Sequence, residues 1–314
     1  IMQEIRFSQV ISSNNSMFVN NIFLEDESGY IFSEIFDAST CFNINSLVTK
    51  NDGIFTPNLN QIKAFKKIMY LKDVSEVDTN QMIDQIIDWI DADRRPRNFG
   101  LEDYFYTGPS NPNQQYADNR MFYSLNELKN IPSFRGESWA HLSKYLCAFP
   151  INNFAININT LTKTDGLLFS SLFSELSLDD ADYILSNYPE SGFKDLNELY
   201  LNFQDITFGE LSGNIAFTSN IFHLKTRSKV EDFEASSSSL IYFKNNNNGY
   251  ISIRDINNDL LFNDYVEQNR YVMNLNLTSN VFSSNSNSKI SFREWDCTRV
   301  KFKTKSVVVP EFIT

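Results

Sequence analysis

The spacing of hydrophobic residues changes twice along this chain. Residues 17–45 alternate between apolar and polar positions around a polar turn at 25–29, which predicts strands joined in a hairpin. Between residues 47 and 206, apolar residues recur every three or four positions, the spacing of helices that bury one face. From about residue 207 this period is lost and strand-like segments return. The order is short β, long α, long β.

This order predicts an α+β fold in which a helical domain interrupts a sheet. Each domain then has its own hydrophobic core: residues 1–46 and 207–314 form a single discontinuous β domain, and residues 47–206 form the inserted helical domain. Two sequential domains are the alternative arrangement.

Local signals mark where elements begin and end. Thr56 before Pro57 predicts a helix cap followed by the first helical residue. Three more helix starts pair a capping residue with a carboxylate three positions later: Ser124 with Glu127, Ser177 with Asp180, and Asp195 with Glu198. Runs of Ser and Asn at 236–239, 245–248 and 283–288 predict loops or turns between the later strands.

Two short motifs occur twice, in the same order. NINSL at 43–47 recurs as NINTL at 157–161, and FYSLNEL at 122–128 recurs as FKDLNEL at 193–199. The motifs lie much further apart in the first copy than in the second. We therefore predict a duplicated helical unit, one copy of which carries an inserted loop.

That loop is acidic. Its carboxylates lie in a span broken by Pro96 and Gly100: Asp88, Asp91, Asp93, Glu102 and Asp103. Hard cations bind carboxylate and carbonyl oxygens, so calcium is the expected ion. Counted from Asp91, the carboxylates fall at positions 1, 3 and 12 of an EF-hand, but Arg95 and Pro96 at positions 5 and 6 exclude that motif. A solvated acidic loop that caps the next helix is the metal-free alternative.

Net charge, apolar runs and cysteine content indicate which partners and which covalent bonds to expect. The net charge of −12 would repel phosphate backbones, so we expect no nucleic-acid partner. No long apolar run is present, and the first ten residues include the charged Glu4 and Arg6. We therefore expect a soluble chain. Cys41, Cys147 and Cys297 form no CxxC motif. Buried free thiols are the favoured interpretation, with a Cys147–Cys297 disulfide as the alternative.

Motifs of catalysis are absent from the sequence. It contains no GxSxG, P-loop or dinucleotide-binding motif. His141 and His223, its only histidines, lie beside no obvious nucleophile, and no sugar cleft is indicated near Glu102 and Asp103. We therefore predict that the chain is not an enzyme.

Several of these segments, taken in order, resemble one family. DWIDADRRPRNFGLEDYFY at 88–106 is followed by NRMFYSLNELKNIPSF at 119–134, ININT at 156–160, SGFKDLNEL at 191–199 and SNIFHLKTRSKVE at 219–231. With FDASTCFNINSL at 36–47, this set resembles the type II secretion minor pseudopilin K, also called general secretion pathway protein K. The resemblance covers roughly residues 36–226, and nothing beyond about residue 255 contributes to it.

The resemblance implies a pseudopilin-like antiparallel sheet with a large helical insertion. It also implies a place at the periplasmic tip of the pseudopilus, assembly with the minor pseudopilins I and J, and support for protein export across the outer membrane. Calcium would lie in the helical domain, and the motif match gives Asp91, Asp93, Glu102 and Asp103 as its ligands, with Asp88 and Asn119 as further candidates. Members begin with a hydrophobic helix anchored in the inner membrane; we expect this chain to be the soluble portion without it.

Two other functions fit parts of the pattern. NINTL followed by short helices resembles helix-hairpin-helix nucleic-acid binders, although the chain lacks their basic hairpins and Gly-rich turns. The aromatic, β-rich C-terminal third also suits a secreted, calcium-dependent carbohydrate or peptide binder. The minor pseudopilin remains the prediction, and the secreted binder is its alternative.

Overall fold

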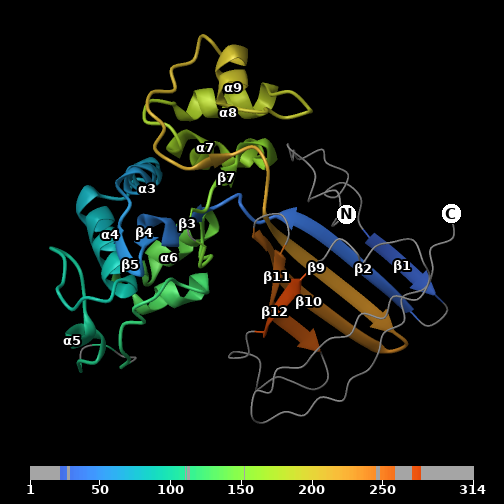
Figure 1. Cartoon of the computed structure of the whole chain (residues 1–314), viewed down its shortest axis with the longest axis horizontal. Coiled ribbons are helices and arrows are strands. Elements are labelled where there is room, and N and C mark those ends of the chain that lie inside the picture. Colours follow the sequence, from blue (N-terminus) through green and yellow to red (C-terminus); the bar gives the residue numbers. More distant parts are fainter. Residues whose placement is uncertain are drawn as a thin grey trace.

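The main sheet joins strands from two distant parts of the sequence, because β2 lies beside β9 (Figure 1). The computed structural model describes residues 22–26, 29–109, 111, 114–151, 153–244, 248–258 and 271–276. Six strands lie in the order β1–β2–β9–β10–β11–β12, and every pair is antiparallel. Their bounds are β1 Ile22–Asp26, β2 Gly29–Asp37, β9 Ile221–Val230, β10 Phe233–Lys244, β11 Asn248–Asn258 and β12 Tyr271–Asn276.

All the helices within the described residues lie between β2 and β9. The α-helices are α3 Leu59–Leu71, α4 Glu76–Ile90, α5 Asp103–Tyr106, α6 Glu137–Leu142, α7 Gly166–Ser171, α8 Leu178–Asn187 and α9 Leu196–Asn202. The 3-10 helices are η1 Ile44–Leu47, η2 Leu125–Asn130, η3 Pro132–Phe134, η4 Ser143–Tyr145, η5 Ile158–Thr160 and η6 Lys163–Asp165. Short strands complete the region: β3 Phe42–Asn43, β4 Val48–Asn51, β5 Ile54–Pro57, β6 Leu146–Cys147, β7 Ile156–Asn157 and β8 Ile215–Ala216.

The predicted α+β fold, an antiparallel sheet interrupted by a helical insertion, is confirmed. The boundaries of the two predicted domains stay a prediction. The segment RVKFKTKSVVV and the polar run at 283–288 lie outside the described residues.

The insertion leaves and re-enters the sheet at one point. Asp37, the last residue of β2, pairs with Phe222 of β9, and the N–H of Ala38 donates to the carbonyl of Ile221 at 3.0 Å. The Asp37 carboxylate also accepts hydrogen bonds from the hydroxyls of Thr160 and Ser219. The outgoing chain, the returning chain and η5 are therefore fastened together at the end of the sheet.

The helical region consists of two units built in the same way. In the first unit, residues 42–149, β3 pairs in parallel with β6. In the second unit, residues 156–217, β7 pairs in parallel with β8. In each unit a 3-10 turn follows the first strand, and a capped LNEL helix comes later, η2 in the first unit and α9 in the second. The duplication predicted from the repeated motifs is thus visible in the fold.

A buried asparagine clamps each unit at its repeated motifs. The Asn45 amide bonds both the N–H and the carbonyl of Phe122, each at 2.8 Å, and its nitrogen also donates to the carbonyl of Phe149. The Asn159 amide does the same at Phe193, at 2.7 and 2.8 Å, and also donates to the carbonyl of Phe217. We call these contacts the asparagine clamps. They give buried, irregular backbone the hydrogen-bond partners that a sheet would otherwise supply.

The hydrophobic core lies mainly in the helical region. It is one continuous cluster that runs from Phe42 to Ile221, and Leu240 and Tyr242 pack against it from β10. Lys67 of α3 links the two units, because its ammonium donates to the carbonyls of Phe173 and Leu176 at 2.7 Å. None of the helices in the described part of the chain is both long and apolar enough to cross a membrane.

The cysteine prediction is wrong. Cys41 and Cys147 form a disulfide, so neither is a free thiol and Cys147 does not pair with Cys297, which lies outside the described residues. The bridge fastens the start of the first unit to its end, beside the β3–β6 pair. It closes a loop of more than 100 residues, for which loop entropy predicts a stabilisation of roughly 4–5 kcal/mol.

Two local predictions also need correction. Thr56 and Pro57 belong to β5, and Asn58 is the cap of α3, because its side chain accepts the N–H of Gln61. Residues 236–239 lie within β10, between β9 and β11, although their serines suggested a loop. Backbone pairing with strands on both sides outweighs the weak strand preference of serine there.

The asparagine clamps make a direct prediction about stability. Asn159→Ala removes the partners of the buried N–H of Phe193 and the carbonyl of Phe217, so we expect the free energy of unfolding to fall by about 2–4 kcal/mol. Asn202→Ala is the control, since its exposed amide bonds only within α9, and it should change stability by less than about 0.5 kcal/mol. Urea unfolding followed by circular dichroism checks both values; equal losses would contradict the clamp.

Candidate metal centre

Helix α4 delivers the first carboxylates of the site. Ser75 caps it by accepting the N–H of Asp78 at 3.1 Å, and its predicted apolar residues are buried: Met82, Ile83, Ile86, Ile87 and Ile90. The same burial carries Asp88, in the last turn, fully out of solvent, with 0% of its surface exposed. Asp91 then caps the helix end, and the chain turns outward to Asp93.

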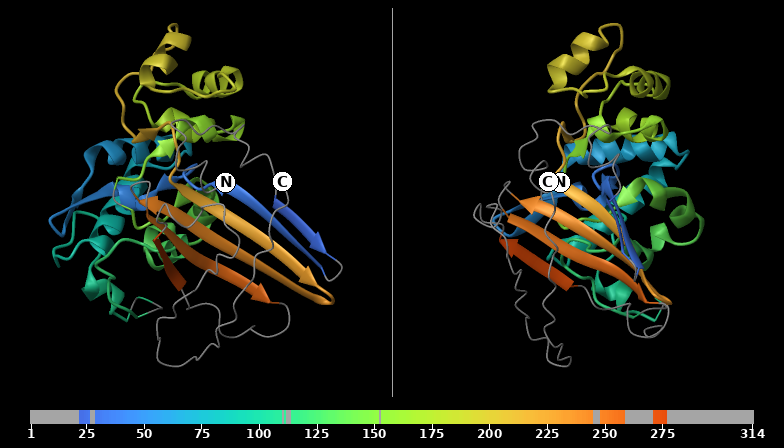
Figure 2. Two further views of the ribbon diagram at one scale, coloured as in Figure 1. Left: turned by 45° about the vertical axis from the view of Figure 1, so that its right-hand side comes forward. Right: turned by 90° about the vertical axis from the view of Figure 1, so that its right-hand side faces the viewer.

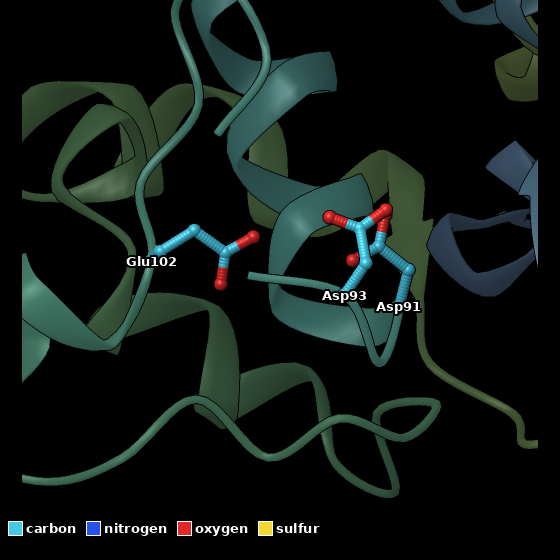
Figure 3. Close-up of side chains that lie close together, drawn as sticks. All are labelled: Asp91, Asp93 and Glu102. Atoms are coloured by element: carbon cyan, nitrogen blue, oxygen red, sulfur yellow. The ribbon is translucent and has the colours of Figure 1, made fainter. Parts of the chain in front are cut away.

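Three carboxylates from two segments converge beyond this helix end. Asp91, Asp93 and Glu102 each place an oxygen within 4.8 Å of those of the other two. Figure 3 shows Glu102 reaching toward the two aspartates from a separate stretch of chain. Asp91 and Glu102 are buried, whereas Asp93 is exposed. The cluster therefore has an inner side in the protein and an outer side open to water.

Aromatic packing brings the second segment into place. Glu102 directly precedes α5, whose Tyr106 packs edge-on against Trp89 of α4 with ring centroids 4.8 Å apart. Phe122 stacks against Trp89 with ring centroids 6.0 Å apart. Since Asn45 holds the backbone of Phe122, the first asparagine clamp also supports the site.

Arg97 is the counter-ion of the site within the described residues. Its guanidinium lies 3.4 Å from Asp88 and 3.6 Å from Asp91, and its backbone N–H donates to Asp88 at 3.0 Å. Gly100 permits this contact, because a Cβ there would lie 1.7 Å from an oxygen of Asp88. One arginine thus faces a larger number of carboxylates.

Burial and mutual repulsion make the carboxylates weak acids. Burial, followed by the charges of its neighbours, raises the pKa of Glu102 to about 7. Burial also raises the pKa of Asp88 to about 7, against the effect of its bond from Arg97, and raises the pKa of Asp91. Bringing these anions together therefore costs free energy that a bound cation would offset.

Unpaired oxygens show that the site suits a hard cation. Asp91 Oδ1 and Glu102 Oε1 are buried and accept no hydrogen bond from the described residues, whereas Asp88 Oδ1, which also accepts none, faces the Arg97 guanidinium. Buried polar atoms normally have a partner, so two such oxygens in one cluster favour a ligand. Carboxylate oxygens on a loop with free backbone carbonyls are the ligand type of calcium.

The other residues expected from the sequence take different places. Asp103 stands outside the group of three, and its carboxylate accepts the N–H of Ala117 at 2.9 Å, which ties α5 to the chain that follows. Asn119 donates its backbone N–H to the carbonyl of Trp89 at 3.1 Å. Arg97 was not predicted; its place directly after a proline in an acidic loop was the available signal.

Comparison with known proteins agrees with the architecture of two units. The first domain of type II secretion system protein K matches residues 40–151, and a second domain described as type II secretion system protein K matches residues 156–217. Together these ranges cover more than half of the chain and coincide with the two helical units. The chain belongs to the type II secretion system protein K family.

Relatives in this family come from several bacteria. A type II secretion system protein K of Aeromonas hydrophila is 27% identical over 74% of this chain and 72% of its own length. That of Pectobacterium carotovorum is 30% identical over 69% of this chain and 67% of its own length. A putative member from Escherichia coli is 28% identical over 66% of this chain and 65% of its own length.

A solved structure shares the fold. One chain of the crystal structure of the GspK–GspI–GspJ complex from the type 2 secretion system of enterotoxigenic Escherichia coli aligns with a TM-score of 0.67. The alignment covers 82% of this chain and 89% of that one, at 21% identity. The predicted family and fold are therefore both confirmed.

The raised pKa values predict how pH acts on the metal-free protein. Asp88 and Glu102 hold their protons up to about pH 7 when folded and only to about pH 4 when unfolded. The folded state therefore binds more protons in this window, so stability should fall as pH rises from 5 to 7.5 and change little above that.

Urea unfolding in chelator at each pH measures this loss. Glu102→Gln mimics the protonated carboxyl at every pH, so the variant should lose less stability across the same window. The same dependence on pH in variant and parent protein would contradict the assignment.

Proposed function

We propose that this chain is a minor pseudopilin that caps the tip of the type II secretion pseudopilus and assembles there with the minor pseudopilins I and J. The observation that carries this proposal is its fold, shared over four-fifths of its length with a chain of the GspK–GspI–GspJ complex. Membership of the protein K family supports it independently. The role is that of a structural subunit on the periplasmic side of a secretion system.

The shape of the molecule supports a position at the end of a filament. The helical region gathers at the end of the sheet where β2 finishes and β9 begins, and α8 and α9 form one extremity of the molecule, beyond α7 (Figures 1 and 2). A subunit stacked above that end would collide with the helices. Growth could then continue only from below, so the filament would carry this protein at its front and push its cargo outward.

Association with its partners would depend mainly on apolar contact. The chain carries a net charge of −12, so a neighbour of like charge would be repelled. The β1–β2 hairpin offers Phe23 and Phe36 on one face and Leu24 and Ile31 on the other, each more than two-fifths exposed. Burying such residues is the usual source of affinity at the centre of an interface.

Calcium completes the proposal. Asp91, Asp93 and Glu102 would hold the ion, and Asp103 would add charge while it keeps α5 in place. A divalent cation would remove the repulsion among the carboxylates and give their unpaired oxygens a partner. The ion would thus fix the acidic segment between α4 and α5 without taking part in catalysis.

Thermal unfolding tests the metal. Calcium at a hundred times its dissociation constant should stabilise the protein by about 2.7 kcal/mol, a rise in Tm on the order of 5 °C. Asp93→Asn with Glu102→Gln should abolish this rise while leaving the Tm in chelator the same or higher, because the variant removes repulsion as well as ligands.

Asp205→Asn is the matched control, because it removes one exposed carboxylate far from the site along the chain. It should keep the full response to calcium. Asp103→Asn keeps the acceptor for Ala117 and should keep most of the response. An equal calcium response in parent and double variant would rule out this site.

The tip role can be tested by removing the helical region. Because Asp37 and Phe222 face each other across β2 and β9, residues 39–220 can be replaced by a two-residue turn that joins the strands as a hairpin. In cells that carry this variant of the full-length protein, we expect longer pseudopili and reduced secretion. Electron microscopy and assay of secreted protein measure the two effects.

Co-purification with soluble I and J gives a separate check on assembly. The parent protein should form the complex. Absence of any complex would refute the partnership, whereas unchanged pseudopilus length and secretion in the hairpin variant would refute the capping role alone.

A further inference from the structure

Two lysines converge on one tyrosine between the helical units. Lys72, at the end of α3, and Lys144, in η4, lie over the ring of Tyr145 with their ammonium nitrogens 5.3 and 4.9 Å from its centroid. Burial alone would raise the pKa of the Tyr145 phenol, but the two neighbouring ammonium groups outweigh it and lower that pKa. Three groups that favour a negative charge therefore share one place.

No carboxylate among the described residues pairs with Lys72 or Lys144. Within the described part of the chain, neither lysine makes an ion pair with an acidic group. This is unusual in a protein with a net charge of −12, where acidic neighbours are plentiful. The negative end of the α3 dipole favours Lys72 in its place, but the two like charges still repel each other.

A small cavity opens beside these groups. It has a volume of about 250 Å³ and is lined by Thr40, Lys144, Tyr145, Thr164, Asp165 and Leu168. Thr40 and the end of the first unit form one side of the cavity, and the start of the second unit forms the other. The cavity can hold a few non-hydrogen atoms with their water and is smaller than a typical drug-sized pocket.

Covalent and backbone contacts hold the walls of the cavity together. The Cys41–Cys147 disulfide lies directly beside Thr40 in sequence and two residues after Tyr145. On the opposite wall, the Asp165 carboxylate accepts the N–H and the hydroxyl of Thr162, both at 2.7 Å. The site is thus built from three fixed segments.

We propose that this cavity binds a carboxylate group, with Lys144 and the Tyr145 hydroxyl as its recognition elements and Lys72, over the Tyr145 ring, as a second positive charge beside it. Asp165 also lines the cavity without pairing with either lysine, so two ammonium groups and one carboxylate leave a single positive charge in excess. A carboxylate matches that excess, whereas a phosphate dianion would bring a second charge close to Asp165. Leu168 offers an apolar contact to the carbon chain that bears the carboxylate.

Titration followed by NMR with a minimal probe tests this site. N-acetylglycine presents the free carboxylate of a peptide end, and N-acetylglycinamide is the same molecule without the charge. We expect N-acetylglycine to shift the backbone amides of Lys144, Thr164 and Leu168 in a saturable manner and to raise the pKa of Tyr145, since a bound anion disfavours the phenolate. The uncharged amide should do neither.

Variants identify the groups responsible. Lys72→Gln with Lys144→Gln should weaken binding of N-acetylglycine by about tenfold or more, because both positive charges are lost. Lys129→Gln is the matched control: Lys129 likewise lies over an aromatic ring, that of Trp139 at 4.6 Å, and does not line the cavity. The control should bind as the parent protein does. Tyr145→Phe should retain part of the affinity.

Three results would overturn the proposal. These are no saturable shift with N-acetylglycine, equal shifts with N-acetylglycinamide, or tighter binding of inorganic phosphate than of N-acetylglycine. Unchanged affinity in a folded double-lysine variant would do the same. All four are independent of calcium and of assembly with I and J, so failure here leaves the proposed function standing.

Discussion

The pairing of β2 with β9 is the constraint on which the rest of the molecule depends. These strands are neighbours, yet residues 38–220 separate them, so the whole helical region must start and finish within one strand spacing. Asp37 strengthens this crossing by accepting bonds from η5 and from the returning chain, and its burial raises its pKa. A large helical region can therefore be inserted between two paired strands without interrupting the hydrogen bonds of the sheet.

Within that region, side-chain amides do the work of secondary structure. Many elements are single turns, too short to satisfy their own backbone groups. The asparagine clamps satisfy donors and acceptors on segments far apart in sequence, and the Lys67 ammonium does the same for carbonyls at the turn after α7. The aromatic stack behind the acidic cluster rests on the first of these clamps, so the geometry of the candidate metal centre derives from a buried amide.

The sequence was informative where a local pattern had a local cause. The period of α4, the caps at Ser177 and Asp195 and the repeated NIN motifs led to the correct elements, because each depends on residues a few positions apart. The partner of Cys41 and the strand at 236–239 depended on which distant segments meet, and spacing along the chain carries no such information. Composition identified the acidic loop, and the family resemblance gave the carboxylates at 91, 93 and 102 among the candidate ligands; the burial of Asp88 and the position of Arg97 required the fold.

The duplication also shows where a domain of this kind can accept insertions. Both copies keep the clamp and the capped LNEL helix, while only the first carries the long acidic segment between them. The clamp fixes both ends of the segment between the two repeated motifs and leaves its length free, so each unit can accept an insertion there. In the second unit this segment is short, and a new loop could be inserted in it without disturbing the sheet or the first site.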